Sequence, residues 1–158
     1  TGDLQYKGFN NNLIVRGNAV YGNLGASGAL TTINNSSSAA SGYPNTTVAQ
    51  NAVSYGGEAG YNIGSFFHSK APRIYPFIRY EYYNPQEEGE KGQLPMDKRN
   101  QVSMWTAGLN WYALPNLVVK ADYMTRQIGT GKVFGKGKYN SENEFSIGIA
   151  YVGWFIKK

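Results

Sequence analysis

One arrangement of ionisable residues occurs in three separate segments of this chain: a basic residue, followed two positions later by a polar or acidic one. The three pairs are Arg16/Asn18, Arg79/Glu81 and Lys120/Asp122. Because successive side chains of a β-strand point to opposite faces, residues two positions apart share one face. A charge on a lipid-facing strand surface costs roughly 2–4 kcal/mol at the membrane midplane. If these segments cross a membrane, the pattern therefore predicts a water-filled lumen lined by charged groups.

Other charged residues extend this group. The side chains that we expect to face the lumen are Lys7, Arg16, Glu58, Arg79, Glu81, Lys120, Asp122 and Arg126. Five are basic and three are acidic, an excess of 5 − 3 = +2, and rings of basic side chains in a pore favour anions. Two interpretations remain open: a selectivity surface for solutes, or a structural network that cancels its own charge. Glu58 and Arg79 lie at equal distances from the middle of the 65–72 connection, so we expect them to pair across neighbouring strands.

Alternation of apolar and polar residues predicts the strands that hold these groups. In one segment, Leu117, Val119 and Ala121 share an apolar face, while Lys120 and Asp122 lie on the opposite face. Similar alternation marks about seven strands: Leu4–Phe9, Leu13–Leu24, Ala52–Gly64, Arg73–Asn84, Val102–Ala113, Leu117–Gln127 and Glu144–Ile156. The sequence therefore predicts an all-β protein.

Large aromatic residues lie on the apolar faces and many are near strand ends. Those expected to form an aromatic girdle are Tyr80, Tyr82, Trp105, Trp111, Tyr151 and Phe155. Amphipathic rings flanking a short apolar band are typical of both rims of a membrane barrel. A soluble β-sandwich would carry many Lys, Glu and Thr side chains on its outer face, whereas the polar faces here are rich in Gly, Asn and Ser. The pattern indicates an antiparallel transmembrane β-barrel of the outer-membrane type.

The connections between the predicted strands alternate between short and long. Short links are expected at 10–12, 65–72 and 114–116, and long polar ones at about 25–51, 85–101 and 128–143. Outer-membrane barrels have short periplasmic turns and long external loops, and bacterial single-chain barrels have even strand numbers. Seven strands in this order would start outside the cell. We therefore expect residues 1–158 to be the C-terminal portion of a single, larger outer-membrane β-barrel.

Composition argues against several other classes of function. The chain of 158 residues has no cysteine, and His68 is its one histidine. His68 is expected to be a solvated turn residue rather than the base of a serine triad, and no metal-ligand spacing occurs. The net charge of +5 is dispersed along the chain, which argues against a nucleic-acid partner. We expect a protein that is not an enzyme and that needs no cofactor or metal.

Two runs of residues resemble the phosphate-selective porin O and P family. Tyr75–Tyr83 (YPFIRYEYY) is similar to one strand of that family, and Thr106–Tyr123 (TAGLNWYALPNLVVKADY) is similar to its next hairpin. Asp3–Tyr6 and Gly56–Tyr61 fit less specifically. The resemblance spans most of the chain. It implies a 16-stranded, trimeric porin that passes anions.

We thus expect a porin of the bacterial outer membrane, embedded in the lipid bilayer, that lets small solutes diffuse passively with a preference for anionic ones. It is expected as a homotrimer or within a larger outer-membrane complex. One alternative is a complete eight-stranded barrel with a filled lumen and a structural role, which requires an eighth strand near Ala29–Asn34. Another is a scaffold barrel without an open pore, with the 25–51 link as a contact surface for other proteins.

Overall fold

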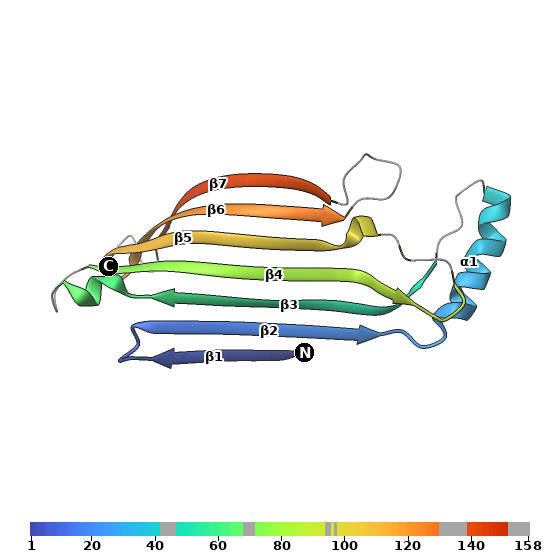
Figure 1. Ribbon diagram of the computed structural model, residues 1–158, viewed down its shortest axis with the longest axis horizontal. Coiled ribbons are helices and arrows are strands. Elements are labelled where there is room, and N and C mark those ends of the chain that lie inside the picture. Colours follow the sequence, from blue (N-terminus) through green and yellow to red (C-terminus); the bar gives the residue numbers. More distant parts are fainter. Residues whose placement is uncertain (42–46, 68–71, 94–95, 97, 130–138, 152–158) are drawn as a thin grey trace, which may run out of the picture.

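The protein folds into a single antiparallel sheet of long strands. The computed structural model describes residues 1–41, 47–67, 72–93, 96, 98–129 and 139–151. The strands are β1 (Gly2–Gly8), β2 (Leu13–Asn23), β3 (Ala49–Tyr61), β4 (Arg73–Gly89), β5 (Val102–Leu114), β6 (Leu117–Gly129) and β7 (Tyr139–Tyr151). Each pairs with its neighbour in sequence, in the order β1 to β7 (Figure 1). The predicted all-β class and the number of strands are confirmed. Within the described residues β1 and β7 do not pair with each other, so this sheet is not closed.

The register divides the sheet into two chemically different faces. Arg16, Glu58 and Arg79 lie directly opposite one another on β2, β3 and β4. The side chains that lie on the same side of the sheet as these three, at alternate positions along each strand, form what we call the polar face. Trp105 and Tyr80 face each other between β5 and β4 on the other side, which we call the apolar face.

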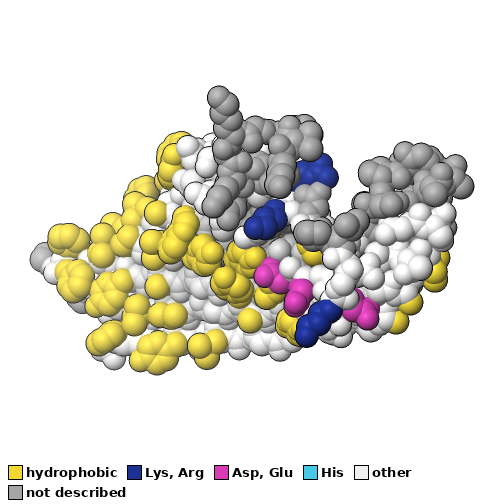
Figure 2. Space-filling view, turned by 45° about the vertical axis from the view of Figure 1, so that its right-hand side comes forward, with side chains coloured by type: hydrophobic (Ala, Val, Ile, Leu, Met, Phe, Trp, Pro, Cys, Tyr) yellow, Lys and Arg dark blue, Asp and Glu magenta, His cyan; other side chains and the backbone are white. Residues whose placement is uncertain are grey.

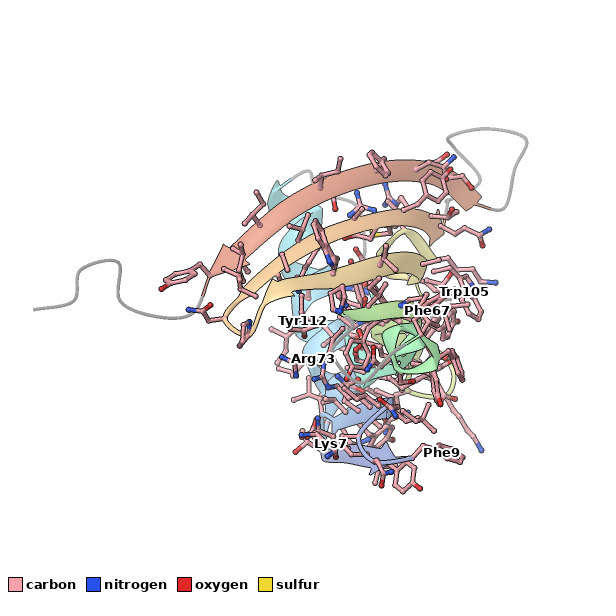
Figure 3. All side chains as sticks on the ribbon, turned by 90° about the vertical axis from the view of Figure 1, so that its left-hand side faces the viewer. Lys7, Phe9, Phe67, Arg73, Trp105 and Tyr112 are labelled. Carbon is pink, nitrogen blue, oxygen red and sulfur yellow. The ribbon has the colours of Figure 1, made fainter. Side chains whose placement is uncertain are left out.

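The sheet curves toward its polar face. Figure 3 shows Lys7, Arg73 and Tyr112 on one side of the sheet and Trp105 on the other. The near ends of β5, β6 and β7 sweep to the side that carries Lys7 and Arg73, so the polar face is concave there and the apolar face is convex. The curvature places the charged side chains inside the arc.

The apolar face is largely uncovered. Trp105 is 55% exposed, Ile147 69% and Ile149 73%, whereas Val102 is the single hydrophobic residue of the described chain that is buried. Figure 2 shows hydrophobic side chains spread over a broad area of the surface, apart from the charged ones. A water-soluble sheet would bury such a face against a second layer. This face is therefore suited to contact with lipid.

One end of the sheet carries short connections, and we call it the short-turn end. Asn10 and Asn11 join β1 to β2 with φ of 57° and 66°, a left-handed conformation that Asn adopts more readily than most residues. Two residues, Pro115 and Asn116, separate β5 from β6. The β3–β4 connection includes the 3-10 helix η1 (Ile63–Phe66), and His68 lies outside the described residues.

The opposite end, which we call the long-connection end, contains a helix that alternation did not predict. It is α1 (Ser27–Ser41) between β2 and β3, and a short 3-10 helix, η2 (Lys98–Asn100), precedes β5. The eighth strand considered near Ala29–Asn34 is wrong, because those residues are helical. No helix in the described part of the chain is both long and apolar enough to span a membrane.

Several strands begin earlier or end later than predicted. β3 starts at Ala49, β4 continues to Gly89 and β7 starts at Tyr139. The structure therefore shortens each of the long links predicted at 25–51, 85–101 and 128–143, and residues 130–138 of the last link lie outside the described chain. The added strand segments are short and mostly polar, so they carry no apolar period by which alternation could have detected them.

Candidate functional site

All eight ionisable side chains expected to face a lumen lie on the polar face. They are Lys7 on β1, Arg16 on β2, Glu58 on β3, Arg79 and Glu81 on β4, and Lys120, Asp122 and Arg126 on β6. The register adds four charged residues that were not in the predicted set: Asp3, Arg73, Glu142 and Glu144. Arg73 and Glu144 lie within predicted strands, so strict alternation contained the signal for them. Asp3 and Glu142 lie just outside the predicted strands and join β1 and β7 only in the structure.

Glu58 is the centre of an ion-pair network on this face. Its Oε2 accepts hydrogen bonds from Arg79 Nε at 2.9 Å and from Arg79 Nη2 at 2.5 Å. Its Oε1 accepts a third from Arg16 Nη1 at 3.2 Å. Arg79 Nη1 also lies 3.9 Å from Glu81 Oε2. The predicted pairing of Glu58 with Arg79 is confirmed, and four side chains of alternating charge cross three adjacent strands.

A second pair of contacts joins β6 to β7. Arg126 donates hydrogen bonds to Glu142 Oε2 through both Nε and Nη2. Asp122 Oδ1 accepts a hydrogen bond from Ser146 Oγ at 2.9 Å. Arg126 is therefore paired with a carboxylate on the same face, whereas the hydrogen-bond partner of Asp122 is an uncharged hydroxyl.

Three basic side chains on the polar face lie outside these ion pairs. Within the described chain Lys7 and Lys120 have no ion-pair partner, and both are exposed. The Arg73 guanidinium lies over the Tyr112 ring, with 4.9 Å between its Cζ and the ring centroid. All three basic groups lie on the part of the polar face nearer to the short-turn end.

The charges of the polar face balance in total but are separated along the strands. The basic residues are Lys7, Arg16, Arg73, Arg79, Lys120 and Arg126, and the acidic ones are Asp3, Glu58, Glu81, Asp122, Glu142 and Glu144. The sum over the described strands is 6 − 6 = 0. The eight residues of the predicted set alone give 5 − 3 = +2, and the difference comes from one basic and three acidic residues that this set did not include.

The separation follows from the register rows. Arg16, Glu58 and Arg79 lie in one row across the strands. On the short-turn side of this row the polar face carries three basic residues and one acidic residue, Asp122, so the net charge there is 3 − 1 = +2. On the long-connection side it carries one basic residue, Arg126, and three acidic residues, Asp3, Glu81 and Glu142, so the net charge there is 1 − 3 = −2. The polar face is thus positive toward one end and negative toward the other.

The Glu58 network also borders an open hollow on the polar face. Its lining includes Arg16, Arg79, Glu58, Glu81 and Asp3. Two basic and three acidic side chains give 2 − 3 = −1, and both guanidinium groups already contact carboxylates. This hollow therefore offers little net attraction to an anion, in contrast to the region of Lys7, Arg73 and Lys120.

Aromatic rings form a contiguous band on the apolar face. The Tyr80 and Trp105 ring centroids lie 4.7 Å apart, and those of Tyr55 and Tyr82 lie 5.0 Å apart in a stacked arrangement. Tyr55 also approaches Tyr80, at 6.2 Å. Three predicted girdle residues thus pack against one another, together with Tyr55, which was not in the predicted set.

Two further predicted girdle residues lie nearer to the short-turn end. Trp111 and Tyr151 are on the apolar face of β5 and β7, and Phe155 lies outside the described residues. Trp105 and Trp111 are separated by 111 − 105 = 6 residues, or about 20 Å along an extended strand. The strands of an outer-membrane barrel tilt by about 35–45° and its apolar band is about 25 Å tall. The two tryptophans would therefore lie about 15 Å apart along the membrane normal, within such a band.

A long-stranded antiparallel sheet with an exposed apolar face, banded aromatic rings and charged groups on its concave face defines a protein of the outer-membrane β-barrel class. The family model described as phosphate-selective porin O and P matches residues 4–152. The chain belongs to this porin family, whose members are outer-membrane proteins of bacteria. The resemblance seen in the sequence is thus confirmed. No curated protein and no solved structure matches the chain.

Proposed function

We propose that the protein is a passive diffusion channel for small solutes and that it prefers anions. The polar face lines the water-filled lumen, and the apolar face meets the lipid of the outer membrane. The aromatic band around Tyr80 and Trp105 lies at one membrane interface, where amphipathic rings are favourable. Family membership supports the channel activity.

One observation supports the preference for anions: three basic groups, Lys7, Arg73 and Lys120, lie near one end of the polar face without ion pairs in the described chain. Glu58 and Glu142, in contrast, are neutralised by arginines. Unpaired basic side chains around a pore attract anions and repel cations. The short-turn end of the lumen is therefore the selective zone.

We further propose that the sheet forms part of the wall of a closed barrel with 16 strands. The outer edges of β1 and β7 carry backbone N–H and C=O groups that a bilayer cannot hydrate. β1 and β7 run in the same direction, because six antiparallel pairings separate them. Further strands would pair both edges. A trimer stays a prediction from the family resemblance.

The proposal is tested by recording the purified porin in planar lipid bilayers under a KCl gradient. Stepwise conductance with a reversal potential on the anion-selective side is expected. In a Lys7→Gln/Lys120→Gln variant the reversal potential should move toward zero, because the positive zone loses two of its charges. Lys91→Gln is the matched control, since Lys91 is an exposed residue between β4 and β5.

The two parts of the proposal fail separately. A correctly folded wild-type protein that gives no stepwise conductance would refute the channel. A reversal potential that is equal in the wild type and the Lys7→Gln/Lys120→Gln variant would refute the role of these lysines in anion preference. A larger shift for Lys91→Gln than for the double variant would also refute it.

A further inference from the structure

The position of α1 relative to the polar face carries a further inference. Figure 1 shows α1 beyond the strand ends at the long-connection end, and Figure 3 shows it displaced toward the concave side of the sheet. Its 15 residues span about 22 Å at 1.5 Å per residue. Five neighbouring strands span about 19 Å at roughly 4.8 Å per pair. The helix is therefore long enough to extend across a large part of the mouth of the proposed lumen.

Two hydrogen bonds hold the first turns of α1 against the sheet. The backbone N–H of Gly28 donates to Glu90 Oε2 at 2.6 Å, and Glu90 directly follows β4. The backbone N–H of Val48, which precedes β3, donates to Thr31 Oγ1 at 2.9 Å. A carboxylate beside a helix N-terminus is also stabilised by the helix dipole. The anchor therefore connects α1 to the ends of two neighbouring strands.

Burial supports a fixed rather than a loosely attached helix. Ser27 is 0% exposed and Thr31 is 1% exposed, although most of the described sheet is open. The Thr31 hydroxyl also donates to the Ser27 carbonyl at 2.8 Å, so this side chain bonds both within the helix and to the strand connection. The next residues, Thr32 and Ile33, are exposed.

The chemistry of α1 differs from that of the polar face. Its sequence, SGALTTINNSSSAAS, contains no Asp, Glu, Lys or Arg. Its residues 27–36 carry hydroxyl, amide and apolar side chains, whereas the polar face holds twelve charged side chains. An uncharged element in the mouth of a pore narrows the path for every solute, whereas rings of charged side chains discriminate between anions and cations.

We infer that α1 is a fixed, uncharged constriction at the long-connection mouth of the channel, and that its anchor at Glu90 and Thr31 sets the upper size of the solutes that enter. The inference rests on the proposed channel function. Size and charge are then selected at opposite ends of the lumen: α1 limits size at one mouth, and Lys7, Arg73 and Lys120 select charge near the other.

The test uses a Glu90→Ala/Thr31→Val variant of the purified porin in planar bilayers. Valine has nearly the shape of threonine but cannot accept the hydrogen bond from Val48. The matched control is Glu88→Ala, which removes the same charge two residues away, where Glu88 Oε2 contacts Asn51 rather than α1. Single-channel conductance and the largest polyethylene glycol that lowers it are measured, together with the rate of proteolysis within 27–41.

The anchor variant should be cleaved faster in this segment, conduct more and admit larger polymers, while its reversal potential stays equal to that of Glu88→Ala. Faster cleavage without any change in conductance or polymer cut-off overturns the constriction. An unchanged cleavage rate overturns the anchor. A wild-type protein without conductance instead overturns the proposed function, so the two failures are distinguishable.

Discussion

Replacing Glu58 by glutamine separates the two effects of the central ion-pair network. Glutamine keeps the shape of glutamate and one carbonyl acceptor but loses the negative charge. Glu58 is the shared partner of Arg16 and Arg79, and its side chain is 18% exposed. The variant therefore leaves two guanidinium groups without their carboxylate on the polar face.

The loss of stability follows from the exposure of the partners. The Arg16 side chain is 56% exposed, so this contact contributes about 0.2–1 kcal/mol. The Arg79 side chain is 42% exposed and donates two hydrogen bonds to one oxygen. A hydrogen bond to a charged group contributes roughly 1.5–3 kcal/mol when it is protected, and solvent screening lowers this to about 1 kcal/mol. We expect Glu58→Gln to lower the free energy of unfolding by about 1–2 kcal/mol.

The same substitution should strengthen anion preference. A unit charge about 8 Å from a passing ion interacts by about 0.5 kcal/mol in water, and 0.1 M salt roughly halves this. Each ion's local concentration then changes about 1.5-fold, in opposite directions for anions and cations. The anion-to-cation permeability ratio should rise about twofold.

Glu81→Gln is the matched control, because it removes the same charge from the same face. Glu81 lies 3.9 Å from Arg79 and its side chain is 41% exposed, so its loss should cost little stability. Urea unfolding in lipid vesicles, followed by tryptophan fluorescence, measures the first effect, and reversal potentials measure the second. Equal destabilisation by both variants, or no destabilisation by Glu58→Gln, would refute the reasoning about the network.

Two further pairs of substitutions test the assignment of the faces and the ion pair between Arg126 and Glu142. Ala121→Arg places a charge on the apolar face of β6 and should lower the free energy of unfolding in vesicles by roughly 2–4 kcal/mol. Met124→Arg places the same charge on the polar face and should change this free energy by less than about 0.5 kcal/mol. Similar losses for both variants in urea titrations would contradict the assignment of the faces. Arg126→Gln and Glu142→Gln should each lower the melting temperature, and the double variant should lower it by less than the sum. Additive losses would show that the pair is uncoupled.

The sequence predicted the faces of the sheet well, because a period of two depends on local backbone geometry alone. The Glu58–Arg79 pairing followed from equal distances to a short connection, which set the register of β3 against β4. The eight predicted polar-face residues share one face for the same reason. That these residues line a lumen is a proposal, because a lumen requires further strands that pair with the outer edges of β1 and β7 and close the barrel.

Contacts between segments far apart in the sequence could not be predicted. α1 is rich in Ser, Thr and Asn, which are poor helix formers, and its anchor at Glu90 lies 62 residues from Gly28. Arg16 joins Glu58 across 42 residues and the α1 connection. The Arg126–Glu142 pair required the position of β7, which begins with polar residues outside the apolar period. Tertiary contacts determined each of these features.

The most direct test of the central claim is the water accessibility of alternate residues along β6. The chain has no cysteine, so single cysteines at 119 to 124 can be labelled with a charged, water-soluble thiol reagent in the membrane-embedded porin. We predict that cysteines at the positions of Lys120, Asp122 and Met124 react and lower the conductance, while those at Val119, Ala121 and Tyr123 stay unlabelled. Equal labelling at all six positions, or labelling of the apolar face alone, would contradict a lumen lined by the polar face.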